Sequence, residues 1–81
     1  MEDLKKEEGK LEREIGNVFA FAISKNYVEF VKFLINMGVD VDARDDVGMT
    51  PLMWAAYYGN VEIAKLLLDN GADVNARSGL C

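Results

Sequence analysis

The sequence predicts an all-α fold, a helical repeat solenoid with short hairpin-like fingers between its repeats. Residues 38–44 return as residues 71–77, 33 positions later, with five of the seven residues unchanged. Apolar residues recur at helical spacing before each copy. A fixed period of this length indicates one helix-containing unit stacked on the next.

The second repeat, residues 45–77, contains the expected elements in order. After a turn rich in Asp and Gly, Thr50 and Pro51 match a helix N-cap followed by Pro at the first helical position. Gly59 ends this helix, and residues 61–69 form a second one with a broad apolar face. The side chains that we expect to face the core are Leu52, Ala55, Ala56, Ile63, Ala64, Leu66, Leu67 and Leu68.

The first repeat, residues 12–44, has the same plan. Asn26 stands where Gly59 stands in the second repeat, and Asn tolerates the left-handed conformation better than most residues. Residues 39–49 then form the finger between the repeats. The side chains that we expect to face the core are Phe19, Ala22, Ile23, Val28, Val31, Leu34 and Ile35.

These residues carry a family resemblance. Residues 45–77 resemble a nearly complete ankyrin repeat, and residues 12–44 resemble an amino-terminal capping repeat in which residues 15–18 replace the turn and Thr-Pro. Ankyrin repeats usually have His after Thr-Pro-Leu, with its ring bonded to the threonine. Met53 stands there in this chain, so that bond cannot form and we expect a looser helix start. The motifs that match are Thr50-Pro51-Leu52, Ala55-Ala56, Gly59, the leucine run and residues 71–76.

The two ends differ from the repeats. Residues 1–11 are predicted to be a charged helical extension of an ankyrin-repeat domain over residues 12–81, in which residues 78–81 begin a third turn. Leu4, Leu11, Ile15, Val18 and Ala22 fall on one helical stripe, which favours a helix that extends the first repeat backwards. Stacked repeats usually need three units and polar caps, and no carboxyl-terminal cap is visible. We therefore expect apolar side chains on the outer face of the second repeat, and with them a fragment of a longer solenoid, a dimer or a minimal engineered chain.

The composition argues against several partners. Nine basic residues stand against fourteen acidic ones, a net charge of −5, so binding to nucleic acid or to an anionic membrane is not expected. The longest uncharged run, residues 15–24, is too short to span a bilayer. Cys81 is the only cysteine, which excludes an internal disulfide and favours an intracellular, cytoplasmic setting.

Residues that carry chemistry are scarce. The chain has no histidine, and Ser24, Ser78 and Cys81 have no activating base in a recognisable pattern. The acidic residues near Asp45 lack the Gly and Glu of a calcium loop, and the pair Asp45-Asp46 is interpreted as a solvated turn. We therefore predict no catalytic residue, no metal, no cofactor and no enzymatic activity, although the chain could be the regulatory piece of an enzyme.

The resemblance implies a binding surface made of finger tips and first helices. Tyr57 and Tyr58 are the best contact candidates, because aromatic residues are enriched at interface hot spots, whereas Trp54 is expected to be partly buried. The predicted function is a protein–protein interaction module or scaffold, and the alternative is a homo-oligomer assembled through the uncapped repeat face. The predicted partner-binding residues are Asp46, Val47, Met49, Trp54, Tyr57, Tyr58 and Asn70, with Ser24, Lys25 and Met37 contributed by the first repeat.

Overall fold

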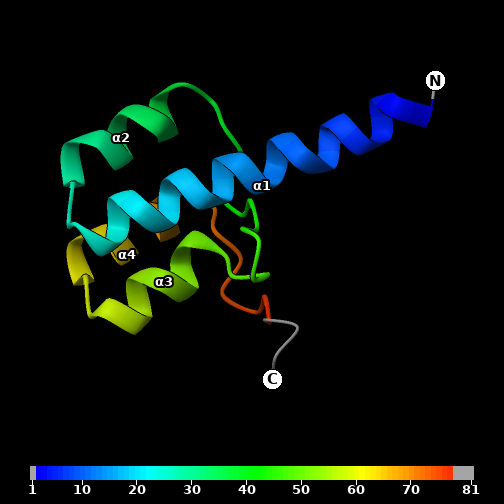
Figure 1. Ribbon diagram of the computed structural model, residues 1–81. Coiled ribbons are helices and arrows are strands. Elements are labelled where there is room, and N and C mark those ends of the chain that lie inside the picture. The colour runs from blue at the N-terminus through cyan, green and yellow to red at the C-terminus, as the bar shows by residue number, and fades with distance from the viewer. Residues whose placement is uncertain (1, 78–81) are drawn as a thin grey trace.

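Two helix pairs make up the part of the molecule that the structure describes. The computed structural model describes residues 2–77, in which α1 (Glu2–Ser24) pairs with α2 (Val28–Asn36) and α3 (Pro51–Tyr58) pairs with α4 (Val61–Asp69). The pairs lie side by side, with α1 against α3 and α2 against α4 (Figure 1). No strand occurs within the described range, and the predicted all-α repeat fold is confirmed.

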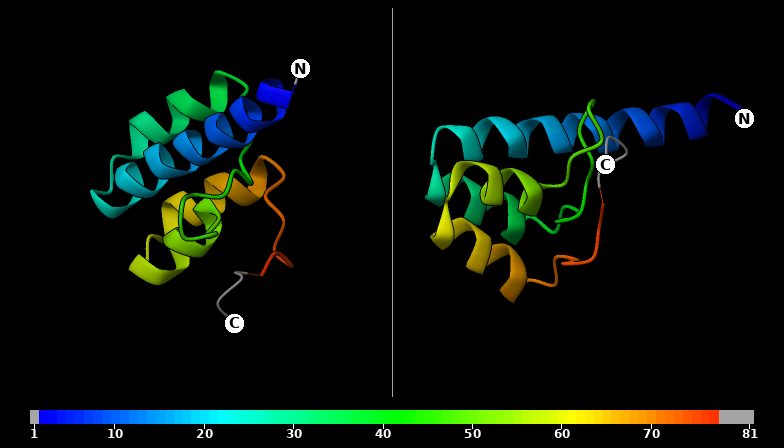
Figure 2. Two further views of the ribbon diagram at one scale, coloured as in Figure 1. Left: turned by 45° about the vertical axis from the view of Figure 1, so that its right-hand side comes forward. Right: turned by 90° about the horizontal axis from the view of Figure 1, so that it is seen from below.

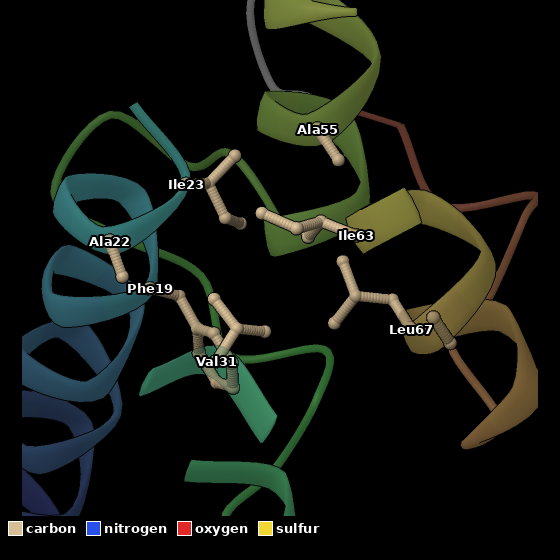
Figure 3. Packing of buried hydrophobic residues seen from close by; sticks show 8 residues of the cluster. Phe19, Ala22, Ile23, Val31, Ala55, Ile63 and Leu67 are labelled. Carbon is tan, nitrogen blue, oxygen red and sulfur yellow. The ribbon is translucent and has the colours of Figure 1, made fainter. Parts of the chain in front are cut away.

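One apolar core fills the seam between the pairs. Phe19 and Ile23 of α1, Val31 of α2, and Ile63 and Leu67 of α4 are fully buried and point toward one another (Figure 3). These side chains were predicted to face inward from the helical spacing alone. Full burial of an apolar side chain of this size contributes about 1.5–3 kcal/mol, so neither pair keeps this stabilisation without the other.

The two helix–helix turns are built alike. Asn26 (φ 58°) and Gly59 (φ 69°) occupy the left-handed region at equivalent positions, as the sequence predicts. In the second repeat the N–H of Asn60 then donates to the carbonyl of Ala55 at 2.9 Å. The side chain of Asn60 also donates to the carbonyl of Ile23 at 2.7 Å, which ties the second turn to the end of α1.

The start of α3 is better supported than expected. The Thr50 hydroxyl accepts a hydrogen bond from the N–H of Met53 at 3.3 Å, while the N–H of Thr50 donates to the Met53 sulfur at 3.5 Å. These two bonds form a capping box in which a thioether replaces the usual polar side chain. The expectation of a looser helix start was wrong, because a flexible thioether can reach back to the N-cap and act as a weak acceptor.

Helix α1 is much longer than the others. Its 23 residues run without a break through the predicted boundary between residues 11 and 12, and its first turns extend beyond the rest of the stack (Figures 1 and 2). The predicted backward extension of the first repeat is therefore a continuation of its first helix. No helix in the described part of the chain is both long and apolar enough to cross a membrane. The predicted third turn at residues 78–81 lies outside that part.

Two expected core residues are exposed. Ala56 of α3 is exposed, and Leu68 of α4 keeps 42% of its surface in contact with solvent. Their equivalents in the first repeat are Ile23, which is fully buried, and Ile35, which is partly buried, because the second repeat covers them. Ala56 and Leu68 occupy the side where another unit would stack. Their prediction as core residues was therefore wrong within residues 2–77, and the expectation of an apolar outer face was right.

Candidate functional site

Three aromatic side chains of α3 form one cluster. The ring of Tyr57 stands perpendicular to that of Trp54, with centroids 5.6 Å apart, while Tyr58 stacks on Trp54 at 5.9 Å. The two tyrosine rings are 5.0 Å apart. Tyr57 is 72% exposed and Tyr58 46%, whereas Trp54 is half-buried. Because each ring holds the next, the cluster presents a large aromatic surface in a single arrangement.

A buried carboxylate joins this cluster to the finger. One oxygen of Asp45 accepts a hydrogen bond from Trp54 Nε1 at 2.7 Å. The other oxygen accepts from the backbone N–H groups of Val47 at 3.1 Å and Met49 at 2.9 Å. The carbonyl of Met49 in turn accepts from the N–H of Asp45 at 3.1 Å, which closes the tip of the finger. Asp45 therefore fixes the finger and α3 relative to each other.

The interpretation of Asp45-Asp46 as a solvated turn is wrong for Asp45. Asp45 is buried and its two oxygens accept three hydrogen bonds, whereas Asp46 is exposed. A charged group is rarely buried unless its acceptor capacity is filled in this way. Sequence reasoning missed Asp45 because Asp is also the residue most typical of an open turn.

Asp46 attaches the finger to the first repeat. Its backbone N–H donates to Asn17 Oδ1 at 3.1 Å, and Asn17 Nδ2 donates to an Asp46 carboxylate oxygen at 3.0 Å. Arg13 Nε lies 3.7 Å from the other Asp46 oxygen. At the same place Gly16 lets α1 approach so closely that an added Cβ would overlap the backbone of Arg44. The finger is thus fixed at both sides, by α1 and by α3.

The remaining predicted contact residues are distributed as follows. Val47 is exposed and Met49 is half-buried, and both belong to the finger that Asp45 organises. Asn70 lies at the end of α4, where its side-chain amide donates to the carbonyl of Leu66 at 2.8 Å and caps that helix. The structure therefore brings six of the seven residues into one finger-and-α3 surface, hereafter the finger–aromatic surface, and gives Asn70 a local structural contact. Its members are Asp46, Val47, Met49, Trp54, Tyr57 and Tyr58.

The first-repeat candidates have contacts of their own. Ser24 donates its hydroxyl to the carbonyl of Phe21 at 2.7 Å, and Lys25 Nζ lies 5.9 Å from the Phe21 ring centroid. Met37 is exposed at the end of α2. Sequence reasoning did not single out Phe21, Phe30 or Phe33, although all three are exposed. A comparison of each residue with its counterpart 33 positions later would have found them.

Acidic groups dominate the finger side of the molecule. Asp40, Asp42 and Asp73 accept backbone hydrogen bonds in the loops that precede or follow the tip of the finger. The N–H of Asp73 donates to Asp42 at 3.0 Å, which connects the loops of successive repeats. Within residues 2–77 no enclosed pocket and no group of three metal-ligating side chains is found. This side of the described range is therefore an open, acidic and partly aromatic surface.

These features define a class of protein, the helical repeat solenoids, in which helix pairs share a core and loops project from one end of the stack. Within that class the chain belongs to the ankyrin repeats. A family model described as "Ankyrin repeats (3 copies)" matches residues 4–78. The predicted family is therefore confirmed. Ankyrin repeats generally mediate protein–protein interaction and are typically non-catalytic.

Individual relatives match over short stretches. The chain is 53% identical over 30 residues to palmitoyltransferase akr1 of Schizosaccharomyces pombe, a match that covers 37% of this chain. It is 43% identical over 47 residues, or 58% of the chain, to protein phosphatase 1 regulatory subunit 12A of Mus musculus, and equally to that of Rattus norvegicus. The chain spans about 5% of the length of each of these relatives.

Proposed function

We propose that this chain binds a partner protein through the finger–aromatic surface. The observation that carries the proposal is the contact between Asp45 and Trp54 at 2.7 Å, which makes one unit of the exposed finger and the exposed tyrosines. A surface that is already ordered loses little conformational entropy on binding. Tyr and Trp are also the residues most enriched at interface hot spots.

The charge around this surface favours a partner that offers basic groups beside an apolar anchor. Asp46 is exposed next to Val47, and the whole chain carries a net charge of −5. Complementary charge steers the encounter of two proteins, while the buried aromatic contact provides most of the affinity. A role without catalysis, without nucleic acid and inside the cell remains the expectation from the sequence. The regulatory subunit among the relatives is consistent with a regulatory role for such a repeat domain.

Affinity capture from a cell lysate tests this proposal. The double variant Tyr57→Ala/Tyr58→Ala should lose the captured partner, because it removes the two exposed rings, while its thermal stability falls only slightly. Tyr27→Ala is the matched control, since Tyr27 is also about half exposed but lies in the first repeat. Equal capture by the wild type and the double variant would remove the tyrosines from the site.

The alternative function is self-assembly through the outer face of the second repeat. Leu68 and Val74 are 42% and 65% exposed there, and Ala56 is exposed beside them on α3. Leu67 is unsuitable for a test because it is fully buried in the core. If this alternative holds, Leu68→Glu should convert an oligomer into a monomer that keeps its helical circular dichroism.

A further inference from the structure

The outer face of the first repeat is uncovered and aromatic. In the second repeat, Pro51 and Ile63 are buried and Trp54 and Leu66 are half-buried, because the first repeat lies over them. The residues 33 positions earlier have no such neighbour within residues 2–77. These residues, named here the amino-terminal face, are Val18, Phe21, Phe30 and Phe33, and they are 39%, 56%, 40% and 55% exposed. The first repeat therefore does not have the polar outer surface of a cap.

The chain that leads into the first repeat does not form a finger beside this face. The chain that leads into the second repeat runs through residues 38–46, which include most of the finger, and its counterpart 33 positions earlier is residues 5–13. Those residues are helical and belong to α1, which carries the chain straight out of the stack (Figures 1 and 2). At 1.5 Å per residue this segment moves the chain about 13 Å away from the face along the helix axis. As far as residues 2–77 show, the face is therefore open to a second molecule.

The charges along α1 and just after its end are arranged symmetrically about the middle of this face. Glu14, Val18 and Phe21 are exposed on one side of α1 at i, i+4 and i+7, and the exposed Lys25 follows at i+11, one residue past the helix, where its N–H donates to the Phe21 carbonyl at 3.2 Å. The pair Val18 and Phe21 and the pair Glu14 and Lys25 have the same midpoint, between residues 19 and 20. An antiparallel copy of α1 centred there would place Val18 opposite Phe21 and the Glu14 carboxylate opposite the Lys25 ammonium, twice.

The second helix fits the same symmetry. Phe30 and Phe33 stack with their ring centroids 6.3 Å apart, and their midpoint lies between residues 31 and 32. The midpoint on α2 lies about 5 Å along the helix axis from the start of α2, and the midpoint on α1 lies about 7 Å from the end of α1. The same turn joins these two helix ends, so the two midpoints lie at similar distances from it. A single two-fold axis that crosses both helices therefore passes close to both midpoints. It places α1 of one copy over α1 of the other, and α2 over α2. A self-complementary patch of this kind is what an isologous dimer requires.

We propose that the amino-terminal face binds a second copy of this chain as an antiparallel, head-to-head dimer. The three phenylalanines alone expose about 300 Å² per copy, taking about 200 Å² for each whole side chain. This is a little over a third of the ~800 Å² that each partner buries in a stable interface, and the proposed dimer needs Val18 and the flanking polar side chains to supply the rest. The dimer leaves the finger–aromatic surface free, so it is independent of the proposed function. It also differs from the alternative assembly, which uses the opposite end of the stack.

A charge-reversal cycle tests the register. The molar mass in solution is measured by light scattering and by sedimentation equilibrium, up to high micromolar protein concentration and at one fixed low salt concentration. Glu14→Lys and Lys25→Glu should each weaken the dimer about tenfold, because each turns two attractive pairs into repulsive ones. The double variant Glu14→Lys/Lys25→Glu should return to within about twofold of the wild type, because the pairs reform with opposite polarity. A double variant as weak as the single ones overturns this register.

A second comparison tests the face itself. Phe21→Glu should yield a monomer with unchanged helical circular dichroism, since Phe21 is more than half exposed and supports little of the core. Leu68→Glu, at the opposite end of the stack, should leave the dimer intact. The proposal fails if the wild type remains monomeric, or if its dimer withstands Phe21→Glu and is lost with Leu68→Glu.

Discussion

The two repeats share a backbone plan but begin in different ways. The first helix of the second repeat has 8 residues and starts at Thr50 and Pro51, which cap it and prevent it from extending backwards. Asn17 and Val18 stand at these positions in the first repeat, and α1 continues through them to a length of 23 residues. Asn17 is then free to bond to the finger through Asp46 instead of capping a helix. The first repeat therefore lacks the capped helix start of the second and has a long first helix with an attached finger.

The repeats also differ in what covers them. Phe30 and Ile63 are equivalent by position, yet Phe30 is exposed to 40% and Ile63 is fully buried. The difference arises from the neighbour and not from the residue, because both are large and apolar. A repeat pattern therefore predicts which side of a helix is apolar, while burial depends on whether another unit lies beside it. The following predictions test this comparison, beginning with the largest effect.

Gly16→Ala should destabilise the fold by about 3 kcal/mol or more, because its Cβ would overlap the backbone of Arg44 and Asp45 and force α1 away from the finger. Gly9→Ala is the matched control in the same helix. Its Cβ would meet only the end of a flexible Arg13 side chain, so it should stabilise the protein by up to about 1 kcal/mol. Urea unfolding followed by circular dichroism measures both. Equal effects at the two glycines would contradict the close approach of α1 to the finger.

Ile63→Ala should cost about 2–4 kcal/mol of unfolding free energy, because it leaves a cavity in the shared seam. Phe30→Ala, at the equivalent position of the first repeat, should cost less, about 1–2 kcal/mol, when measured at a low protein concentration where no second copy covers it, because Phe30 is already 40% exposed. The same urea titration compares them. A larger loss for Phe30→Ala than for Ile63→Ala would show that the two faces have been assigned in the wrong order.

Asp45→Ala should cost about 2 kcal/mol, because three N–H groups, including Trp54 Nε1, lose their acceptor. Asp46→Ala should cost less than about 1 kcal/mol, since that carboxylate is exposed to solvent. Asp45→Ala should also weaken partner capture, whereas Asp46→Ala should alter capture only by removing one negative charge from the surface. Similar thermal midpoints for the two variants would contradict the role assigned to the buried carboxylate.

Much of the fold could be predicted from the sequence, because the period of 33 residues and the helical spacing of apolar residues are both visible in the order of residues along the chain. Phe19, Ile23, Val31, Ile63 and Leu67 were assigned to the core on this basis and are fully buried. Leu68 was assigned to the core on the same basis and is exposed. Periodicity identifies the apolar side of a helix, but it does not show whether another unit packs against that side.

The candidate site was predicted in part. The aromatic residues of α3 stood out by residue type, and their clustering follows from their spacing along one short helix. Asp45 and the contact between Asn17 and Asp46 did not stand out, because the partners lie 9 and 29 residues away and no local pattern marks them. The anchors that hold a surface in place are long-range hydrogen bonds, which one sequence does not reveal.

The bond from Trp54 to Asp45 also gives the molecule an intrinsic optical reporter. Trp54 is the only tryptophan in the chain, and its indole touches both the finger carboxylate and the two tyrosine rings. Its emission therefore depends on the order of the finger and on whatever covers the tyrosines. Titration of a partner can be followed by this single fluorophore, without a label attached to either protein.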